Sequence, residues 1–252
     1  MTEGLHRFVV GRFRCTAIAD TEQGARNVLL VEGVQRVLVD TGVGVHNAGN
    51  LGLMGARLGE MGLDAASIDA VVLSHADFDH IGGATNGRDV VFARAPHSIM
   101  RAEVEFWKQR PERLLPSPLY DEAFRERVNA VPPIAIDALG DRLRLVEDGA
   151  QIAPGITMTA APGHTPGNSV VRIESDGEVL LFVADLFYQP ENITIEGWVS
   201  QYDYNPKQVV ETRRRVLDEA AANGALLMAY HLPFPSIGRV ARSRDGWEWI
   251  PV

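Results

Sequence analysis

Residues 70–83 read AVVLSHADFDHIGG, a short apolar run followed at once by a group of titratable side chains. The run Ala70–Leu73 has the length and composition of a buried β-strand. Asp77, Asp79 and His80 then fall within four residues, where they would repel one another or need solvation unless a cation neutralised them. A Gly-Gly pair permits a tight backbone turn directly afterwards. The stretch therefore predicts a strand that ends in a metal-binding loop.

Three further segments place a titratable residue at the end of an apolar, strand-like run: Pro162–Gly167 (PGHTPG), Ala184-Asp185 and Tyr230-His231. Loops at strand ends bring residues that are distant in the sequence to one edge of a sheet. Together with the first stretch, these segments supply four histidines and three aspartates for one cavity. The candidate ligands are His75, Asp77, Asp79, His80, His164, Asp185 and His231.

This mixture of side chains indicates the chemistry. Imidazole suits zinc, iron and nickel, whereas carboxylates suit harder ions such as manganese. Seven ligands are too many for one tetrahedral ion, but they fit two ions that share a bridging carboxylate. Such a pair lowers the pKa of a shared water and favours attack of hydroxide on a carbonyl or phosphoryl group. We therefore expect two divalent ions, with zinc as the expected metal and manganese or iron as alternatives.

Composition narrows the class of protein. The chain has 252 residues, 46% apolar and 23% charged, which is ordinary for a soluble domain with a sizeable core. The net charge of −9 argues against a nucleic-acid surface and against anionic membranes. Cys15 is the only cysteine, which excludes an intramolecular disulfide and a Cys-rich zinc site. With neither a signal-peptide pattern nor a long apolar run, we expect a cytoplasmic protein.

Periodicity predicts an α/β fold with two sheets covered by helices. Expected helices cover 50–62, with Asn50 as N-cap, then 97–110, 119–128 and 206–223; the last is capped by Asn205 and closed by Gly224. The run Arg213–Arg215 is expected to be a solvated helix face, and His6, His46 and His97 to be surface or capping residues. Expected strands are Arg7–Val10, Phe13–Ala19, Asn27–Val31, Val37–Val39, Ala70–Leu73, Ile156–Ala160, Val170–Glu174, Val179–Val183, Ala225–Ala229, Gly238–Val240 and Trp247–Ile250.

The order and rough spacing of five motifs resemble those of the metallo-β-lactamase superfamily. The motifs are Leu38–Gly42 (LVDTG), Ser74–Gly83, Gly163–Gly167, Ala184-Asp185 and His231. The resemblance implies a four-layer αβ/βα sandwich, in which helices flank two mixed β-sheets and the metals lie at one sheet edge. We expect one such domain over residues 1–252, with a helical insertion at about 97–131.

Carried over by position, the resemblance also assigns roles to individual residues. It places His75, Asp77 and His164 around a first metal, and Asp79, His80 and His231 around a second, with Asp185 bridging the two. Asp40 would orient a ligand from behind. A hydroxide held between the metals would be the nucleophile, and Asp79 would handle its proton. Independently, Tyr188 follows Asp185 by three residues and is a candidate for polarising a substrate carbonyl.

Asp77 departs from the pattern, because most hydrolases of this superfamily have histidine there. An aspartate adds negative charge and favours manganese or iron, or leaves the first site weak. Two alternatives to a dinuclear hydrolase follow. One is a dioxygenase with a single iron, and the other is a catalytically impaired, ligand-binding member of the same fold.

The tail, Tyr230–Val240 and Gly246–Pro251, resembles the branch that holds methyl parathion hydrolases and quorum-quenching lactonases. The resemblance implies a lactone or ester substrate, with promiscuous action on phosphotriesters. The negative charges of three aspartates and a hydroxide would cancel the four positive charges of two divalent ions. The centre would then be nearly neutral, which favours a neutral substrate. The apolar insertion suits either a lid or a homodimer surface. Candidate pocket aromatics are Phe106, Trp107, Phe187, Tyr188 and Trp198.

Overall fold

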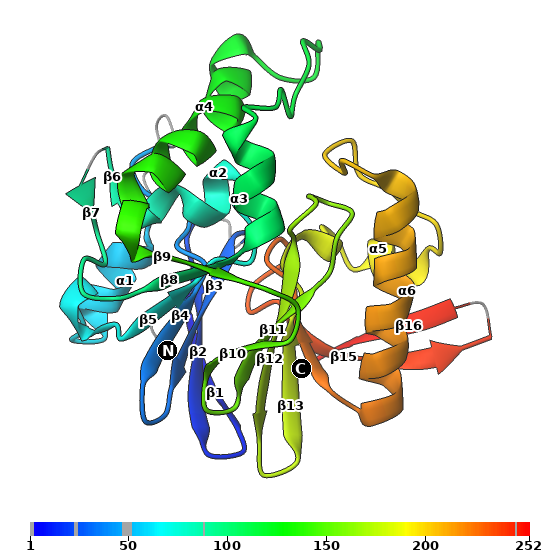
Figure 1. Cartoon of the computed structure of the whole chain (residues 1–252). Helices are drawn as coiled ribbons and strands as arrows, with labels where there is room; N and C mark the ends of the chain where they lie inside the picture. Colours follow the sequence, from blue (N-terminus) through cyan, green and yellow to red (C-terminus); the bar gives the residue numbers. More distant parts are fainter. Residues whose placement is uncertain (1–2, 23–24, 47–51, 88, 245) are drawn as a thin grey trace.

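The computed structural model describes residues 3–22, 25–46, 52–87, 89–244 and 246–252. Within these residues, two seven-stranded sheets form the centre of the molecule, and a two-stranded ribbon lies apart from them. Both sheets are mixed, and helices cover their outer faces (Figure 1). The αβ/βα sandwich expected from the sequence is therefore confirmed.

The first sheet comes from the first part of the chain and has the order β1-β2-β3-β4-β5-β8-β9. Each of the strands β1 to β4 is antiparallel to the next. Strands β4, β5, β8 and β9 run parallel to one another, so that their carboxyl ends share one edge. The strands are β1 Leu5–Val10, β2 Phe13–Ala19, β3 Asn27–Glu32, β4 Arg36–Val39, β5 Ala70–Val72, β8 His97–Met100 and β9 Leu143–Val146.

The second sheet follows in the chain and has the order β10-β11-β12-β13-β14-β15-β16. Its single parallel pair among the described strands is β13 with β14, and both of these strands end at the edge that holds the candidate ligands. The strands are β10 Ala150–Ala153, β11 Ile156–Ala160, β12 Ser169–Ser175, β13 Glu178–Phe182, β14 Leu226–Met228, β15 Ile237–Ser243 and β16 Gly246–Pro251; the separate ribbon is β6 Thr85–Asn86 with β7 Asp89–Val90.

Helices α1, α3 and α4 lie beside the first sheet, and α6 lies beside the second (Figure 1). The main apolar core fills the space between the two sheets and extends beneath the helices of the first, and a second core joins α6 to the outer face of the second sheet. Cys15 is buried in the main core. The helices are α1 Met54–Glu60, α2 Phe78–Ile81, α3 Arg101–Lys108, α4 Glu122–Leu139, α5 Glu191–Thr194 and α6 Pro206–Asn223.

Helix α6 has the ends that its sequence predicts. The Asn205 side chain accepts a hydrogen bond from the backbone N–H of Gln208, and Pro206 occupies the first turn, where no N–H is needed. Gly224 closes the helix in the left-handed conformation, at φ 60°. For α1, the expected cap Asn50 lies outside the described residues, and the helix begins at Met54.

Two helix expectations between residues 97 and 131 are partly wrong. Residues 97–100 form strand β8 within the first sheet, so the helix expected over 97–110 covers only Arg101–Lys108. The helix expected over 119–128 runs instead to Leu139, through Pro132 and Pro133. Each proline removes a backbone hydrogen bond, but burial of apolar side chains along this face of α4 stabilises the helix beyond them.

The arginine run in α6 is not simply a solvated face. Arg213 is buried, and its guanidinium donates to the backbone carbonyls of Leu186 and Trp198. It also lies 3.3 Å from Asp203 Oδ2.

Among the described helices, none combines the length and apolar character that crossing a membrane would require.

Candidate metal centre

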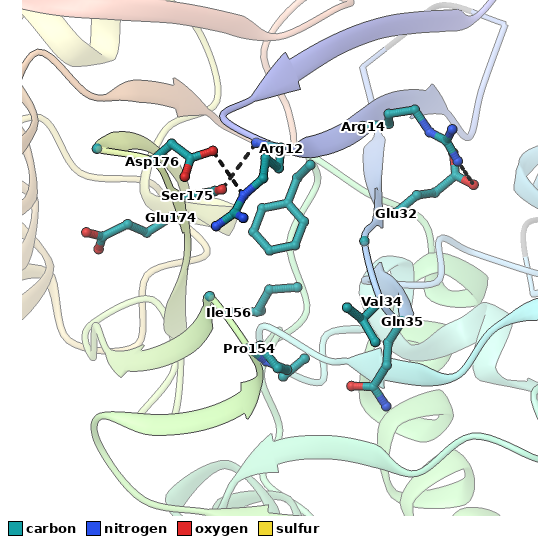
Figure 2. A pocket seen from close by; sticks show the side chains of 15 residues that line it. Arg12, Arg14, Glu32, Val34, Gln35, Pro154, Ile156, Glu174, Ser175 and Asp176 are labelled. Carbon is teal, nitrogen blue, oxygen red and sulfur yellow. Dashed lines mark hydrogen bonds and ion pairs between the residues drawn. The ribbon is translucent and has the colours of Figure 1, made fainter.

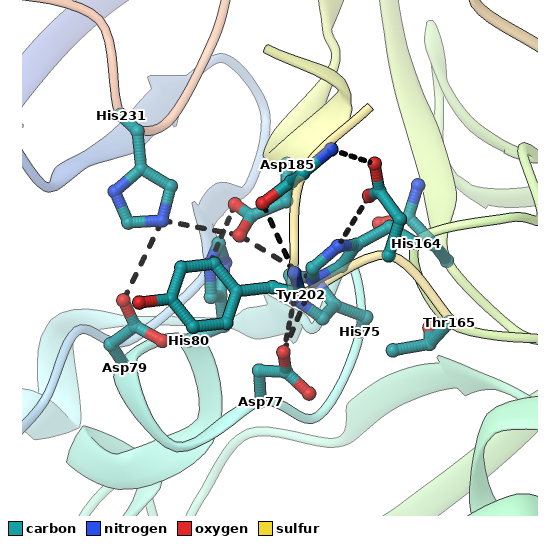
Figure 3. Close-up of polar contacts among 12 residues, drawn as sticks. His75, Asp77, Asp79, His80, His164, Thr165, Asp185, Tyr202 and His231 are labelled. Carbon is teal, nitrogen blue, oxygen red and sulfur yellow. Dashed lines mark hydrogen bonds and ion pairs between the residues drawn. The ribbon is translucent and has the colours of Figure 1, made fainter. Parts of the chain in front are cut away.

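The seven candidate ligands converge from both halves of the chain at one edge of the sandwich (Figure 3). Each follows the carboxyl end of a strand or lies in the loop after it, because parallel strands deliver their ends to the same edge. Strand β5 leads to His75, Asp77, Asp79 and His80, β11 leads to His164, β13 to Asp185 and β14 to His231.

Their potential donor atoms form three overlapping groups, and within each group the atoms lie within 4.8 Å of one another. The groups are His75 with Asp77 and His164, His75 with His80 and Asp185, and Asp79 with His80 and His231. Together they contain all seven residues, and His75 and His80 each belong to two of the groups. Seven candidate donors are more than one tetrahedral ion needs.

The hydrogen bonding of these side chains fits cation ligands. Three of their polar atoms are buried and have no hydrogen-bond partner among the described residues: His75 Nε2, His80 Nε2 and Asp185 Oδ1. His80 Nε2 and Asp185 Oδ1 are only 2.9 Å apart, yet the pair lacks hydrogen-bond geometry. Because buried polar atoms are almost always paired, atoms that converge without a protein partner are typical of a cation-binding site.

Asp40 lies behind this cluster, as predicted for a residue that orients a ligand. Its carboxylate accepts hydrogen bonds from Ser74 N at 2.7 Å and Ser74 Oγ at 2.8 Å, and lies 2.8 Å from His80 Nδ1. Holding Nδ1 in this way turns His80 Nε2 toward the other ligands. Asp40 itself has a positive φ of 62°, an uncommon conformation for a residue with a side chain.

A second residue of this kind, Asp203, was missed because it lies in a loop without any ligand pattern. Its Oδ1 lies 3.1 Å from His164 Nδ1, and its Oδ2 accepts from Ser200 N at 2.7 Å. Burial lowers the pKa of His164, but the contacts with Asp203 and Asp77 outweigh it and raise that pKa to about 9. Asp203 thus does for His164 what Asp40 does for His80.

Glu103 of α3 was also missed, although it joins the two main ligand loops. Its fully buried carboxylate accepts four hydrogen bonds: from Ala76 N at 3.0 Å and Trp107 Nε1 at 2.9 Å through Oε1, and from Thr165 Oγ1 at 2.6 Å and Gly167 N at 3.0 Å through Oε2. Gly167 is required here, since a Cβ would clash with the Glu103 backbone. One side chain therefore fixes both the His75 loop and the His164 loop.

Tyr188 lies where the sequence placed it, against the bridging candidate. Its hydroxyl donates to Asp185 Oδ2 at 3.1 Å and lies 3.3 Å from His164 Nδ1. Its ring stacks on His231, with centroids 4.9 Å apart. Burial and the nearby Asp185 charge raise the pKa of Tyr188 well above its usual value, so the hydroxyl remains a proton donor.

Two arginines also reach the cluster and change its charge. Arg113 Nη2 lies 3.0 Å from Asp77 Oδ2, and Arg26 Nε lies 3.0 Å from Asp79 Oδ2. The expectation of a nearly neutral centre counted neither these two positive charges nor the negative charges of Asp40 and Asp203, so the charge of the seven ligands alone does not argue for a neutral substrate. Nothing in the sequence marks either arginine, because both are supplied by segments without a motif.

The cluster opens into a cavity of about 230 Å³. As far as the described residues define it, the wall does not include Phe106, Trp107, Phe187 or Trp198, which the sequence suggested. Trp107 and Phe187 are fully buried in the cores instead. The wall consists of Arg26, Asp77, Phe78, Asp79, Phe124, Val128, Asp185, Tyr188, Tyr202 and His231.

A larger cavity, of about 750 Å³, lies at the opposite ends of the strands, between the β1–β2, β3–β4 and β12–β13 turns (Figure 2). Its charged side chains pair with one another: Arg12 Nε lies 3.1 Å from Asp176, and Arg14 Nη2 lies 3.7 Å from Glu32. It is remote from every candidate ligand.

Of the histidines outside the motifs, His97 was assigned wrongly to the surface. It is fully buried at the start of β8, and burial lowers its pKa to about 4. His6 and His46 are half-buried, and none of the three belongs to a ligand group among the described residues.

Comparison with known proteins identifies the family. The metallo-beta-lactamase superfamily model matches residues 21–231, and the chain belongs to this superfamily. An N-acyl homoserine lactonase of a Bacillus species is 27% identical over 188 residues, 66% of this chain and 65% of the relative. A probable metallo-hydrolase of Mycobacterium tuberculosis is 26% identical over 192 residues, 64% of this chain and 56% of the relative. The chain thus spans less than two thirds of these curated relatives.

Solved structures agree over the whole length of the chain. AidC, a dizinc quorum-quenching lactonase in complex with a product, superposes with a TM-score of 0.87 at 25% identity, covering 99% of this chain and 97% of the other. The hydrolase AbOPH has a TM-score of 0.86 at 22% identity, covering 100% and 98%. At that identity the second similarity shows the fold alone.

Proposed function

We propose that the protein is a metal-dependent hydrolase of small neutral lactones or esters. The observation that carries the proposal is the convergence of seven candidate ligand side chains, three of whose buried polar atoms (His75 Nε2, His80 Nε2 and Asp185 Oδ1) have no hydrogen-bond partner among the described residues. The similarity to a dizinc lactonase supports the lactone assignment. Neutrality of the substrate rests on that similarity, because the charge of the centre no longer argues for it.

The residues divide into two subsites. His75, Asp77 and His164 would hold one cation, and Asp79, His80 and His231 the other, with Asp185 between them. Two divalent cations, zinc by analogy with AidC and otherwise manganese or iron, would supply a hydroxide near neutral pH and polarise the substrate carbonyl.

The protein side chains position the substrate and move protons. Asp79 lines the cavity, where Arg26 holds its carboxylate, and would take up the proton released during hydrolysis. Tyr188 also lines the cavity and would donate a hydrogen bond to the substrate carbonyl oxygen as negative charge develops there. Phe78, Phe124 and Val128 offer apolar surface for an acyl or aryl group.

A single-iron dioxygenase on this fold is the main alternative. It would need only one of the two subsites, whereas both sets of side chains converge here. An impaired, ligand-binding protein remains the other alternative. Elemental analysis separates the three: two equivalents of a divalent metal support the hydrolase, one iron the dioxygenase, and none the binding protein.

The direct test is a hydrolysis screen across lactones, aryl esters, phosphotriesters and an anionic phosphodiester, with zinc, manganese and cobalt supplied separately. We expect turnover of a lactone or aryl ester that a chelator abolishes and added metal restores. Cleavage of the phosphodiester alone by metal-loaded protein would overturn the substrate assignment while leaving the metal centre intact.

The Tyr188→Phe variant tests the role of the hydroxyl. We expect kcat for lactone hydrolysis to fall about tenfold to a hundredfold, because the lost hydrogen bond acts mainly in the transition state. KM should change little, since the aromatic ring and its stacking on His231 remain. Steady-state kinetics at matched metal content measure both quantities. A rise in KM at constant kcat would instead assign Tyr188 to substrate binding.

A further inference from the structure

Arg113 enters the subsite formed by His75, Asp77 and His164. Its guanidinium contacts both oxygens of Asp77, with Nη2 at 3.0 Å from Oδ2 and Nε at 3.4 Å from Oδ1. Nη2 is also 3.5 Å from His164 Nε2, the nitrogen that would bind a cation. The side chain is only 4% exposed. A fixed positive charge therefore lies within hydrogen-bond distance of one expected ligand and close to another.

The backbone around Arg113 is anchored, so this position is built into the insertion. Asn129 of α4 accepts hydrogen bonds from Arg113 N at 2.7 Å and Leu114 N at 3.3 Å, and its amide donates to Leu114 O at 3.3 Å. The Leu114 side chain packs into a small apolar cluster with Phe78 and Val131. Helix α4 thus anchors the loop that holds the Arg113 guanidinium against Asp77.

We propose that Arg113 is a resident counter-cation of the Asp77 subsite, which competes with a metal ion for the same carboxylate. The inference rests on the proposed function only in treating these residues as a metal subsite. A metal ion that fills this subsite shares the Asp77 carboxylate with Arg113 or displaces the guanidinium from it. The subsite at Asp79, His80 and His231 therefore fills first, and the Asp77 subsite is the weaker one.

Charge and geometry both indicate that Arg113 weakens metal binding at Asp77 rather than assisting it. A guanidinium beside a divalent cation repels it, and this repulsion is large where water is excluded. The fork-shaped contact also uses one lone pair on each Asp77 oxygen, about half of those that the carboxylate offers to a metal. Arg26 differs from Arg113, because its contact with Asp79 involves Nε and one oxygen, and its side chain is 23% exposed.

The Arg113→Met variant tests the competition through metal binding. Purified full-length protein is loaded with Zn²⁺, dialysed against graded concentrations of a chelator, and analysed for zinc per chain. We expect the second equivalent to bind about tenfold or more tightly in the variant, because a repelling charge is gone and Asp77 is free. The control Arg110→Met removes the same charge from an exposed side chain of the same loop and should change nothing.

A second variant keeps the test independent of folding defects. Asn129→Ala leaves Arg113 in place but removes the anchor of its loop, so it should also tighten the second equivalent, by less. The proposal is overturned if Arg113→Met protein has a native circular dichroism spectrum but binds the second equivalent of zinc no more tightly than the parent. If Arg113→Met does not fold, the same result for Asn129→Ala overturns it. Absence of zinc from every variant and from the parent would instead refute the proposed metal centre.

Discussion

The Asp185→Asn variant is expected to lose about a hundredfold or more of its hydrolytic turnover and to bind less metal. Asp185 Oδ1 lies 2.9 Å from His80 Nε2, and its Oδ2 lies 3.1 Å from His231 Nε2 and 3.6 Å from His164 Nε2. The carboxylate thus lies between histidines of both subsites. Asparagine removes its charge and replaces one oxygen by an NH2 group, which cannot bind a cation.

This loss should appear in kcat and in zinc per chain together, as measured by steady-state kinetics and elemental analysis. Asp176→Asn is the matched control, because it makes the same chemical change beside the remote cavity, at a positive φ of 51° that asparagine tolerates. Retention of parental turnover and zinc content by Asp185→Asn would show that Asp185 is not a bridging ligand.

The Glu103→Gln variant should lower the free energy of unfolding by about 3 kcal/mol. All four partners of the Glu103 carboxylate are donors, two on each oxygen. The amide nitrogen of glutamine would have to face two of those donors, leaving buried N–H or O–H groups without an acceptor. The effect is large because the carboxylate is fully buried and water cannot replace the lost acceptor.

Urea unfolding followed by circular dichroism measures this difference. Glu105→Gln serves as the control, since Glu105 lies two residues away on the exposed face of α3 and should shift stability by less than about 0.5 kcal/mol. Equal stability of the two variants would mean that Glu103 does not hold the ligand loops.

The features predicted correctly from the sequence depend on local patterns. Strands β2 and β11 have the predicted bounds, because alternating or continuous apolar residues between turn signals define a strand locally. The caps of α6 are equally local. The convergence of the candidate ligands was predictable because each of them belongs to a short motif at the end of such a strand.

The features that were missed depend on partners distant in the chain. Arg113 meets Asp77 across 36 positions, Asp203 meets His164 across 39, and Glu103 meets Thr165 across 62. No spacing rule connects such pairs. The length of α4 and the strand at His97 were missed for the same reason, since packing against the first sheet overrides the local signals of two prolines and of a helical periodicity.

The division of the ligands between the two sheets has a consequence for biosynthesis. The ribosome releases His75 and its neighbours well before His231, so a nascent chain for a time carries only four of the seven candidate ligands. Until the second sheet docks against the first, these four would lack their partners and would hold cations loosely and without selectivity. We therefore expect correct metal acquisition at the end of folding, when ions bound to the candidate ligands would link the two halves of the polypeptide.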